Sequence, residues 1–317
     1  MPRWRRMLGG MLGRVVSLVL VIVAMALWMW LRPDHRERYE EAAADVSAAA
    51  ADLPAPVGLV KPWTPRSGPG EREGVILTDE HMRAAIGQLS SGCVATVLLS
   101  PTRSLAITAA RCVFVPASAP WRGEGAVGWR AGLTFQPGRT GVTAPFGSWS
   151  VERAWVDERW MSDADQRYDY AFLELGTKGD KRVGDLVSGA SMLVLQDGDR
   201  PDVTVAGYPM SGTRDGRQLV GCSTAEVDRV PEDPALGLLG VGQMALACRM
   251  PRGAVGGPWI AGTGAPNTMG GVVGVTSNTD TTSSFLTGSA LGESSLRLRH
   301  RAEDAIGLPP PRLSSRR

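Results

Sequence analysis

The chain has 317 residues, of which 43% are hydrophobic and 21% charged, and its formal net charge is +2 at pH 7. This composition is ordinary for a globular protein and does not indicate a wholly disordered chain. The net charge is too small to support binding to nucleic acid, so no nucleic-acid partner is expected. The length allows one large domain with additional segments.

The first element in chain order is an apolar segment without charge, Val15–Leu31. At about 1.5 Å per residue, its roughly 17 residues span about 25 Å of a hydrocarbon core of about 30 Å. The side chains of Arg14 and Arg32 can extend to the two interfaces and make up the difference. The sequence therefore predicts a transmembrane anchor over residues 15–32.

A cleaved signal peptide is the alternative to a retained anchor. Ala24-Met25-Ala26 matches a small-x-small cleavage site, but it lies inside the apolar run, which continues through Leu27–Trp30. The run is also longer than the apolar core of a signal peptide, which favours the anchor. Residues 1–14 are basic and contain no acid, so we expect them in the cytoplasm. The protein is then a single-pass protein of the cell membrane with its C-terminal domain extracytoplasmic.

Residues 33–74 are expected to connect the anchor to a folded domain. His35–Asp52 is rich in Ala and Glu, which favour a juxtamembrane helix. Leu53–Gly74 contains five prolines and no apolar periodicity, which is typical of an extended linker. Alternatively, part of this linker packs on the domain surface as an irregular arm.

Residues 75–301 show short apolar runs separated by Gly, Pro, Asp and Asn, which predict an all-β barrel or sandwich. A short helix is expected at Asp79–Leu89. Residues 302–317 are rich in Pro and Arg and are expected to form a disordered tail. The apolar runs are Cys93–Leu99, Leu105–Thr108, Ala171–Leu175, Met192–Leu195, Val203–Gly207, Met244–Cys248 and Gly271–Thr276.

The four cysteines fall into two local pairs along the chain, Cys93 with Cys112 and Cys222 with Cys248. Two disulfides are expected if the domain lies outside the cytosol, and four buried thiols are the alternative. No C-x-x-C motif, P-loop or dinucleotide fingerprint is present, so neither a metal nor a cofactor is expected. The histidines are too few for a zinc site and lie far apart, at His35, His81 and His300.

Five segments between about residues 90 and 300 together resemble the trypsin-like serine proteases, closest to their bacterial, secreted, glutamyl-endopeptidase-like branch. They follow the order of that family, and the resemblance implies a double β-barrel of chymotrypsin type over residues 75–301. The segments are Cys93–Cys112, which ends in TAARC where the family has TAAHC; Tyr168–Leu173, similar to D-[YF]-A-[FL]-L; Val203–Pro209, similar to V-x-G-Y-P; Gly253–Trp259, similar to G-x-S-G-G-P; and Gly271–Val275.

The resemblance places Arg111, Asp169 and Val255 at the catalytic His, Asp and Ser positions. An arginine stays protonated at neutral pH and cannot act as a base, and a valine has no lone pair with which to attack. The chain therefore resembles a degenerate member in which catalysis is lost. We expect Arg111 to form a salt bridge with Asp169; the alternative is an Arg111 in solvent with Asp169 bonded to backbone amides.

The resemblance also assigns the oxyanion hole to the backbone amides of Gly253 and Val255. These amides survive a side-chain change and can still bind a carbonyl or carboxylate. A collapsed loop without exposed donors is the alternative.

The sequence thus predicts a membrane-anchored, catalytically inactive serine-protease-like domain with a binding or assembly role, such as engaging a peptide or protein ligand in the old cleft. One alternative is an active serine-type hydrolase with a displaced catalytic set. The other is an unrelated extracellular β-sandwich, which predicts neither a Cys93–Cys112 bridge nor an approach of Arg111 to Asp169.

Overall fold

The computed structural model describes residue 65 and residues 73–119, 126–196, 199, 201–210, 214–231, 242–250, 252–262, 269–278 and 285–307. They all belong to the second of two compact units, which begins at Pro62. The predicted anchor at 15–32, the juxtamembrane helix and most of the linker lie outside these residues. Within them, no helix is long and apolar enough to cross a membrane.

The described chain is built mainly of short β-strands, as the sequence predicts. In chain order they are β1 (Val75–Ile76), β2 (Ile86–Leu89), β3 (Val94–Val97), β4 (Leu105–Thr108), β5 (Phe114–Val115), β6 (Gly128–Trp129), β7 (Thr134–Pro137), β8 (Trp149–Val156), β9 (Ala171–Leu175), β10 (Ser191–Met192), β11 (Val203–Gly207), β12 (Val220–Thr224), β13 (Asp228–Arg229), β14 (Met244–Ala247), β15 (Pro258–Ala261), β16 (Gly271–Asn278) and β17 (Phe285–Ala290).

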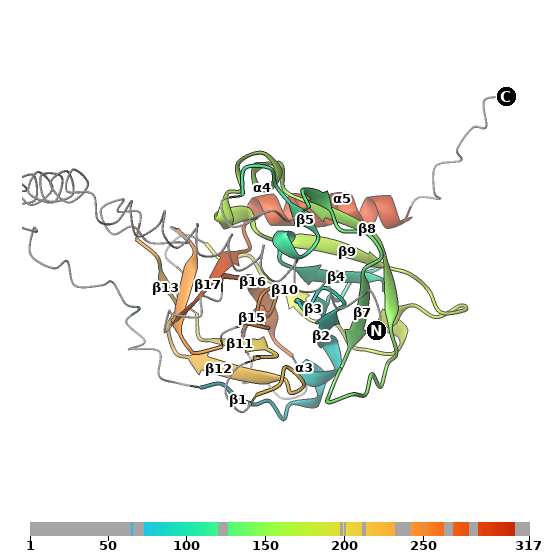
Figure 1. Ribbon diagram of the computed structural model, residues 1–317, viewed down its shortest axis with the longest axis horizontal. Helices are drawn as coiled ribbons and strands as arrows, with labels where there is room; N and C mark the ends of the chain where they lie inside the picture. Colours follow the sequence, from blue (N-terminus) through green and yellow to red (C-terminus); the bar gives the residue numbers. More distant parts are fainter. Residues whose placement is uncertain are drawn as a thin grey trace, which may run out of the picture. The chain divides into compact units, whose positions relative to one another are not determined.

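The first half of the domain is a closed barrel in the order β2-β3-β4-β9-β8-β7 (Figure 1). Strands β2, β3 and β4 are buried at every position, which explains why they are largely apolar, with Gln88, Thr96 and Thr108 as buried polar exceptions. Strand β4 pairs with β9 in antiparallel register from Leu105 opposite Glu174 to Thr108 opposite Ala171. Phe135, Trp149 and Phe172 are fully buried and fill the barrel core.

The second half is a nine-stranded sheet in the order β1-β12-β11-β15-β16-β17-β14-β13, with β10 pairing with β16. The double barrel expected from the resemblance is therefore only partly observed, because closure is seen in the first barrel alone within the described strands. Trp259 and Leu246 are buried in the core of this sheet. Val272 and Val275 of β16 belong instead to the larger core shared with the barrel, so the two halves are packed against each other.

The described residues include three α-helices, α3 (Glu80–Ala85), α4 (Glu158–Asp163) and α5 (Glu293–Gly307). Short 3-10 helices are η1 (Ala110–Cys112), η2 (Gln166–Tyr168) and η3 (Val183–Asp185). Asp79 caps α3, its carboxylate accepting a hydrogen bond from the Met82 amide at 2.7 Å. The helix expected at Asp79–Leu89 is confirmed only as far as Ala85, because Ile86–Leu89 form β2.

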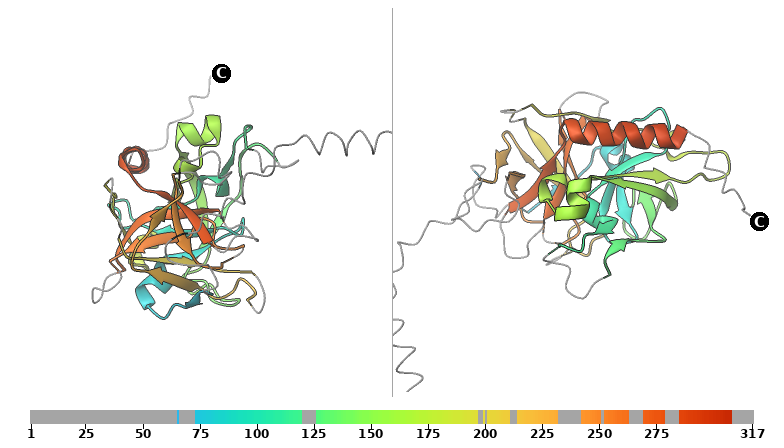
Figure 2. Two further views of the ribbon diagram at one scale, coloured as in Figure 1. Left: turned by 90° about the vertical axis from the view of Figure 1, so that its left-hand side faces the viewer. Right: turned by 90° about the horizontal axis from the view of Figure 1, so that it is seen from above.

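Helix α5 packs along β8 and β9 on the outside of the barrel (Figures 1 and 2). Its buried residues are Ser295, Leu298 and Ala302, spaced three and four apart, which places them on one face of the helix. Because the helix runs to Gly307, the start of a disordered tail expected at residue 302 is wrong. Residues 308–317 lie outside the described chain.

Two disulfides join the expected cysteine pairs, Cys93 with Cys112 and Cys222 with Cys248, so no cysteine is free. The first links the start of β3 to η1, and the second links β12 to the residue that follows β14. Disulfides persist in oxidising compartments, so they are consistent with a domain outside the cytosol. The free-thiol alternative is excluded.

Candidate functional site

The pairing of β4 with β9 explains why Arg111 and Asp169 meet. Thr108, the last residue of β4, lies opposite Ala171, the first residue of β9. Arg111 follows Thr108 in η1, and Asp169 precedes Ala171 directly after η2. Antiparallel neighbours bring the end of one strand beside the start of the next, so both side chains lie at the same edge of the barrel.

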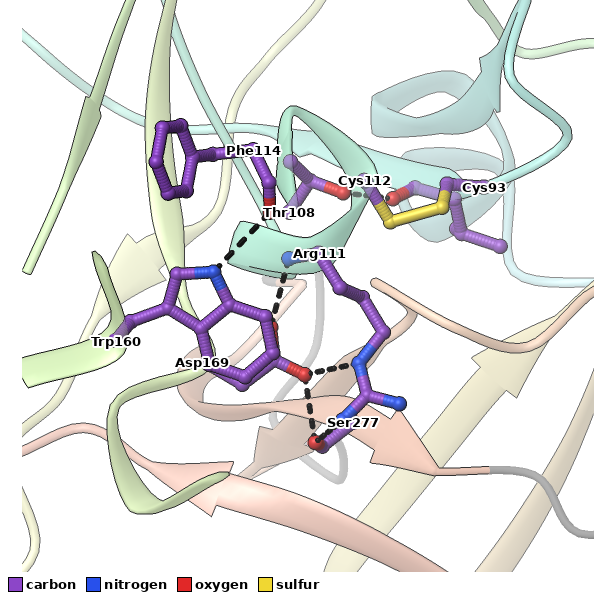
Figure 3. The surroundings of a disulfide bond; sticks show 9 residues. Cys93, Thr108, Arg111, Cys112, Phe114, Trp160, Asp169 and Ser277 are labelled. Carbon is purple, nitrogen blue, oxygen red and sulfur yellow. Dashed lines mark hydrogen bonds and ion pairs between the residues drawn. A yellow bond between two sulfur atoms is a disulfide. The ribbon is translucent and has the colours of Figure 1, made fainter. Parts of the chain in front are cut away.

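Arg111 and Asp169 form a tightly bonded ion pair (Figure 3). The Arg111 Nε donates to Asp169 Oδ2 at 2.5 Å, and the Arg111 backbone amide donates to Asp169 Oδ1 at 2.9 Å. The Asp169 side chain is fully buried, whereas the Arg111 side chain retains 17% of its exposure. The predicted salt bridge is therefore confirmed, and an Arg111 that points away into solvent is excluded.

Two further residues complete this cluster, and the sequence reasoning did not identify either. Ser277 of β16 donates to Asp169 Oδ2 at 2.6 Å and accepts a hydrogen bond from Arg111 Nη2 at 2.9 Å. The guanidinium carbon of Arg111 lies 5.5 Å from the ring centroid of Trp160. The buried Asp169 carboxylate thus accepts three hydrogen bonds, which offset the cost of removing its charge from water.

The loop that carries Val255 lies beside the segment that leads to Arg111. The Val255 carbonyl accepts a hydrogen bond from the Val94 amide at 2.8 Å. Gly256 has φ +81°, and a Cβ there would lie 2.2 Å from the Val94 oxygen and 3.2 Å from the Ala109 nitrogen. Only glycine fits this approach, so the structure requires Gly256 whether or not a nucleophile precedes it. Arg111, Asp169 and Val255 therefore come from segments that pack together.

The backbone of the same loop keeps two donors available. Gly253 has φ +77°, and its carbonyl accepts a hydrogen bond from the Tyr208 amide at 2.8 Å, which fixes the loop. Across the described part of the chain, neither the Gly253 nor the Val255 amide donates a hydrogen bond. The two amides are therefore not used by hydrogen bonds within the described chain, which argues against a collapsed loop. The Val255 side chain is half-buried and packs against the main core.

A second ion pair, Asp157–Arg159, lies beside this cluster. Asp157 caps α4, the helix that carries Trp160, and bonds the Arg159 guanidinium at 2.9 Å. Burial opposes the charge of Asp157, but the hydrogen bonds from Arg159 outweigh it and lower its pKa. The guanidinium carbon of Arg159 in turn lies 3.5 Å from the ring centroid of Tyr168, the residue before Asp169.

Other groups that could take part in acid–base or metal chemistry lie elsewhere. His81 on α3 and His300 on α5 are exposed, and His35 is outside the described chain. Among the residues that the structure describes, no group of three His, Cys, Asp or Glu side chains could hold a metal ion.

Neither Arg111 nor Val255 can carry out proton abstraction or nucleophilic attack at neutral pH. Arg111 is a permanent donor, so it cannot take a proton from a hydroxyl as an imidazole does. Val255 offers no hydroxyl. What remains is a fixed loop with two backbone donors, a type of group that can bind an oxygen anion or carbonyl.

Of the comparisons with known proteins, the one with solved structures supports the fold. No family model matches the sequence, and no curated protein matches it. Among solved structures, protease Anisep from Arthrobacter nicotinovorans is similar with a TM-score of 0.59 and 22% identity, covering 71% of this chain and 98% of that chain. A thermostable serine protease, AL20, from an extremophilic microorganism has a TM-score of 0.58 and 23% identity, covering 70% of this chain and 98% of that chain.

A Glu endopeptidase in complex with MPD is also similar, with a TM-score of 0.56 and 16% identity, covering 74% of this chain and 98% of that chain. The β-sandwich alternative is excluded, because the Cys93–Cys112 bridge and the approach of Arg111 to Asp169 are both present. The described chain therefore has the chymotrypsin-type fold of bacterial trypsin-like serine proteases.

Proposed function

We propose that this protein is a membrane-anchored, extracytoplasmic serine-protease-like domain that has lost catalysis and binds a peptide or protein segment in the former substrate cleft. The observation that carries the proposal is the Arg111–Asp169 ion pair. In this interpretation Arg111 occupies the place of the catalytic base, Asp169 that of its orienting carboxylate and Val255 that of the nucleophile.

The hydrogen bonds of Asp169 support loss of catalysis rather than displacement of the catalytic set. Asp169 bonds Arg111 through both the backbone amide and Nε, and its remaining contact is with Ser277. The Arg111 Nε occupies the position on Asp169 Oδ2 that would otherwise orient an imidazole. Ser277 itself is fully buried and bonded to both Arg111 and Asp169, so its hydroxyl is not presented to a substrate.

The ligand is inferred from the two unused donors of the Gly253–Val255 loop. Convergent backbone amides bind carbonyl or carboxylate oxygens, and neither depends on a catalytic side chain. A peptide with a free C-terminal carboxylate presents two such oxygens and a formal charge. We therefore expect a carboxylate-ended peptide to bind more tightly than its C-terminal amide.

The two disulfides and the apolar segment at residues 15–32 support the location. Disulfides favour an extracytoplasmic domain. The basic residues 1–14 favour a cytoplasmic N-terminus. The segment between the anchor and the domain would then hold the cleft away from the bilayer surface.

Hydrolysis and binding assays test the two halves of this proposal separately. Purified protein incubated with casein should release no fragments above a heat-denatured control. Sustained hydrolysis that heating abolishes would contradict the loss of catalysis and favour a displaced catalytic set.

Binding is measured by calorimetry with a peptide carboxylate and the matching amide. Val255→Pro removes one backbone donor, whereas Val255→Ala keeps it and serves as the matched control. We expect the carboxylate preference to persist in the alanine variant and to be lost in the proline variant. Equal affinity for carboxylate and amide in the unaltered protein would exclude the amides as an anion site.

A further inference from the structure

A groove of about 360 Å³ opens on the outside of the barrel, away from the Arg111 cluster. Three elements form it: the paired strands β5 and β6 with the residues that flank them, strand β8, and the C-terminal end of α5; β5, β8 and α5 are labelled along the upper side of the domain in Figure 1. Trp129, Trp155 and Val151 give it apolar walls, and Ala305 closes it on the helix side. The proposed function uses none of these residues.

The aromatic walls of the groove are fixed in place. Trp129 is 52% exposed, and its ring meets Phe114 edge-on at a centroid distance of 5.0 Å. The guanidinium carbon of Arg153 lies 5.2 Å from the ring centroid of Trp155. Arg153 is itself held by an ion pair with Glu174 and donates to the Ala305 carbonyl at 2.8 Å. A ligand would therefore meet rings that need little further ordering, which favours affinity.

Two indoles beside a shallow groove suit one chemical class of ligand in particular. Proline-rich segments adopt the extended polyproline II helix without internal hydrogen bonds, and they dock into grooves lined by aromatic side chains. The stiff proline rings lose little entropy on binding and pack flat against indole faces. An arginine or acidic side chain at the end of the segment commonly adds a charged contact.

The chain itself carries such a segment directly beyond the groove. Helix α5 ends at Gly307, two residues after Ala305, and the sequence continues as Leu308-Pro309-Pro310-Pro311-Arg312. At about 3.1 Å per residue, these five residues would extend about 16 Å in the polyproline II form. The segment is attached two residues from Ala305 in the lining, and the exposed Glu152 in the same lining offers a carboxylate to Arg312.

We propose that Leu308–Arg312 docks in this groove as a polyproline segment, with its prolines against Trp129 and Trp155. The segment is attached to the end of α5, which lines the groove, so its effective concentration there is on the order of 1 mM. At that concentration even a weakly bound state would be populated. Docking would hold the end of α5 against β8. A proline-rich segment of another protein could compete for the same groove, which makes it a binding site distinct from the old cleft.

Hydrogen exchange of the full-length protein in detergent micelles tests this proposal. The unaltered chain is compared with Pro309→Ser/Pro310→Ser/Pro311→Ser, and exchange is followed by mass spectrometry over residues 127–133 and 150–156. An effective concentration of about 1 mM and an intrinsic affinity of about 0.1 mM imply roughly tenfold slower exchange in the unaltered chain. The substituted residues follow the end of α5 at Gly307, and thermal melting of both chains checks that the domain stays folded.

Two controls make the result specific. Trp129→Ala should abolish the difference between the proline-containing and proline-free tails, and Arg316→Ser/Arg317→Ser should leave it unchanged. A synthetic Leu-Pro-Pro-Pro-Arg peptide added to the proline-free variant should restore the slower exchange. Equal exchange with and without the prolines would overturn the proposal, as would a tail effect that persists in Trp129→Ala. Protection that rises with protein concentration would assign the groove to a second copy and overturn the intramolecular contact.

Discussion

The two segments that pack together at the Arg111–Asp169 cluster differ in their hydrogen bonding. On the barrel side, Arg111, Asp169 and Ser277 bond one another, and the buried carboxylate accepts three hydrogen bonds. On the loop side, Val255 has no polar side chain, yet the amides of Gly253 and Val255 donate no hydrogen bond within the described chain. One segment has a closed side-chain network and the other has an open set of backbone donors.

This difference separates chemistry that side chains provide from chemistry that the backbone provides. One substitution can remove a base or a nucleophile without moving the chain. Backbone donors depend on loop conformation, which the close packing of Gly256 against Val94 and Ala109 enforces. The fold can therefore lose proton transfer and keep a binding geometry. The following experiments test each side, from the largest expected effect to the smallest.

Removing the buried carboxylate should have the largest effect. Asp169→Ala leaves the Arg111 charge without its partner and Ser277 without its acceptor, so we expect a loss of about 3–5 kcal/mol in the free energy of unfolding. Urea denaturation followed by fluorescence measures it. Asp165→Ala, which breaks the more exposed pair with Arg167, is the matched control and should cost less than about 1 kcal/mol. Similar losses of unfolding free energy in the two variants would contradict the claim that the Asp169 network contributes more to stability than an exposed ion pair.

The disulfide on the barrel side should rank second. Cys93→Ser/Cys112→Ser opens a loop with a sequence separation of 19 residues. Chain entropy predicts a cost of about 3 kcal/mol for a loop of this size. Because Arg111 is adjacent to Cys112, the pair should also lose rigidity. A loss below about 1 kcal/mol would show that hydrogen bonds alone hold η1 in place.

The loop side is tested by adding a single methyl group. Gly256→Ala combines a left-handed φ of +81° with a clash against the Val94 oxygen, so we expect a loss of about 2–3 kcal/mol. Gly262 has φ +71° with nothing near its missing Cβ, so Gly262→Ala isolates the conformational cost of about 1 kcal/mol. Calorimetric melting compares the two. Equal losses would show that close packing does not fix the loop.

The pH dependence of stability should show the smallest effect. It depends on the Asp157–Arg159 ion pair, which lies beside the Arg111 cluster. The pKa of Asp157 is lowered in the folded protein, because hydrogen bonds from Arg159 outweigh the opposing effect of burial. Its stabilising contribution is therefore complete above the unfolded pKa of about 4 and is lost as the pH falls through the lower folded value. Asp157→Asn should be less stable at pH 7 and show a shallower decline from pH 4 to pH 2. An unchanged acid slope in urea titrations would contradict this assignment.

Sequence patterns predicted the parts of the molecule that local chemistry determines. Buried strands such as Leu105–Thr108 form continuous apolar runs, and the cysteines bracket short segments that disulfides can close. Arg111 and Asp169 could be paired because each adjoins one of two such strands. Ile86–Leu89 was assigned to a helix instead, since a short apolar run fits either structure and pairing with β3 and β7 decides it.

Contacts between distant segments were not accessible from the sequence. Ser277 lies 108 residues from Asp169 and belongs to the other sheet, and no pattern around it indicates that it faces a carboxylate. The position of Trp160 beneath Arg111 follows from the capping of α4 by Asp157 and from the barrel register. Helix α5 as a whole was not predicted, because the charged run at Arg297–Arg301 hides the spacing of Leu298 and Ala302.

Labelling with a fluorophosphonate probe tests the central claim most directly, because the probe reacts only with a serine that a neighbouring base activates. The account predicts no labelling of the purified full-length protein above a heat-denatured control. It would be contradicted by stoichiometric labelling that heating abolishes and that peptide mapping assigns to one serine.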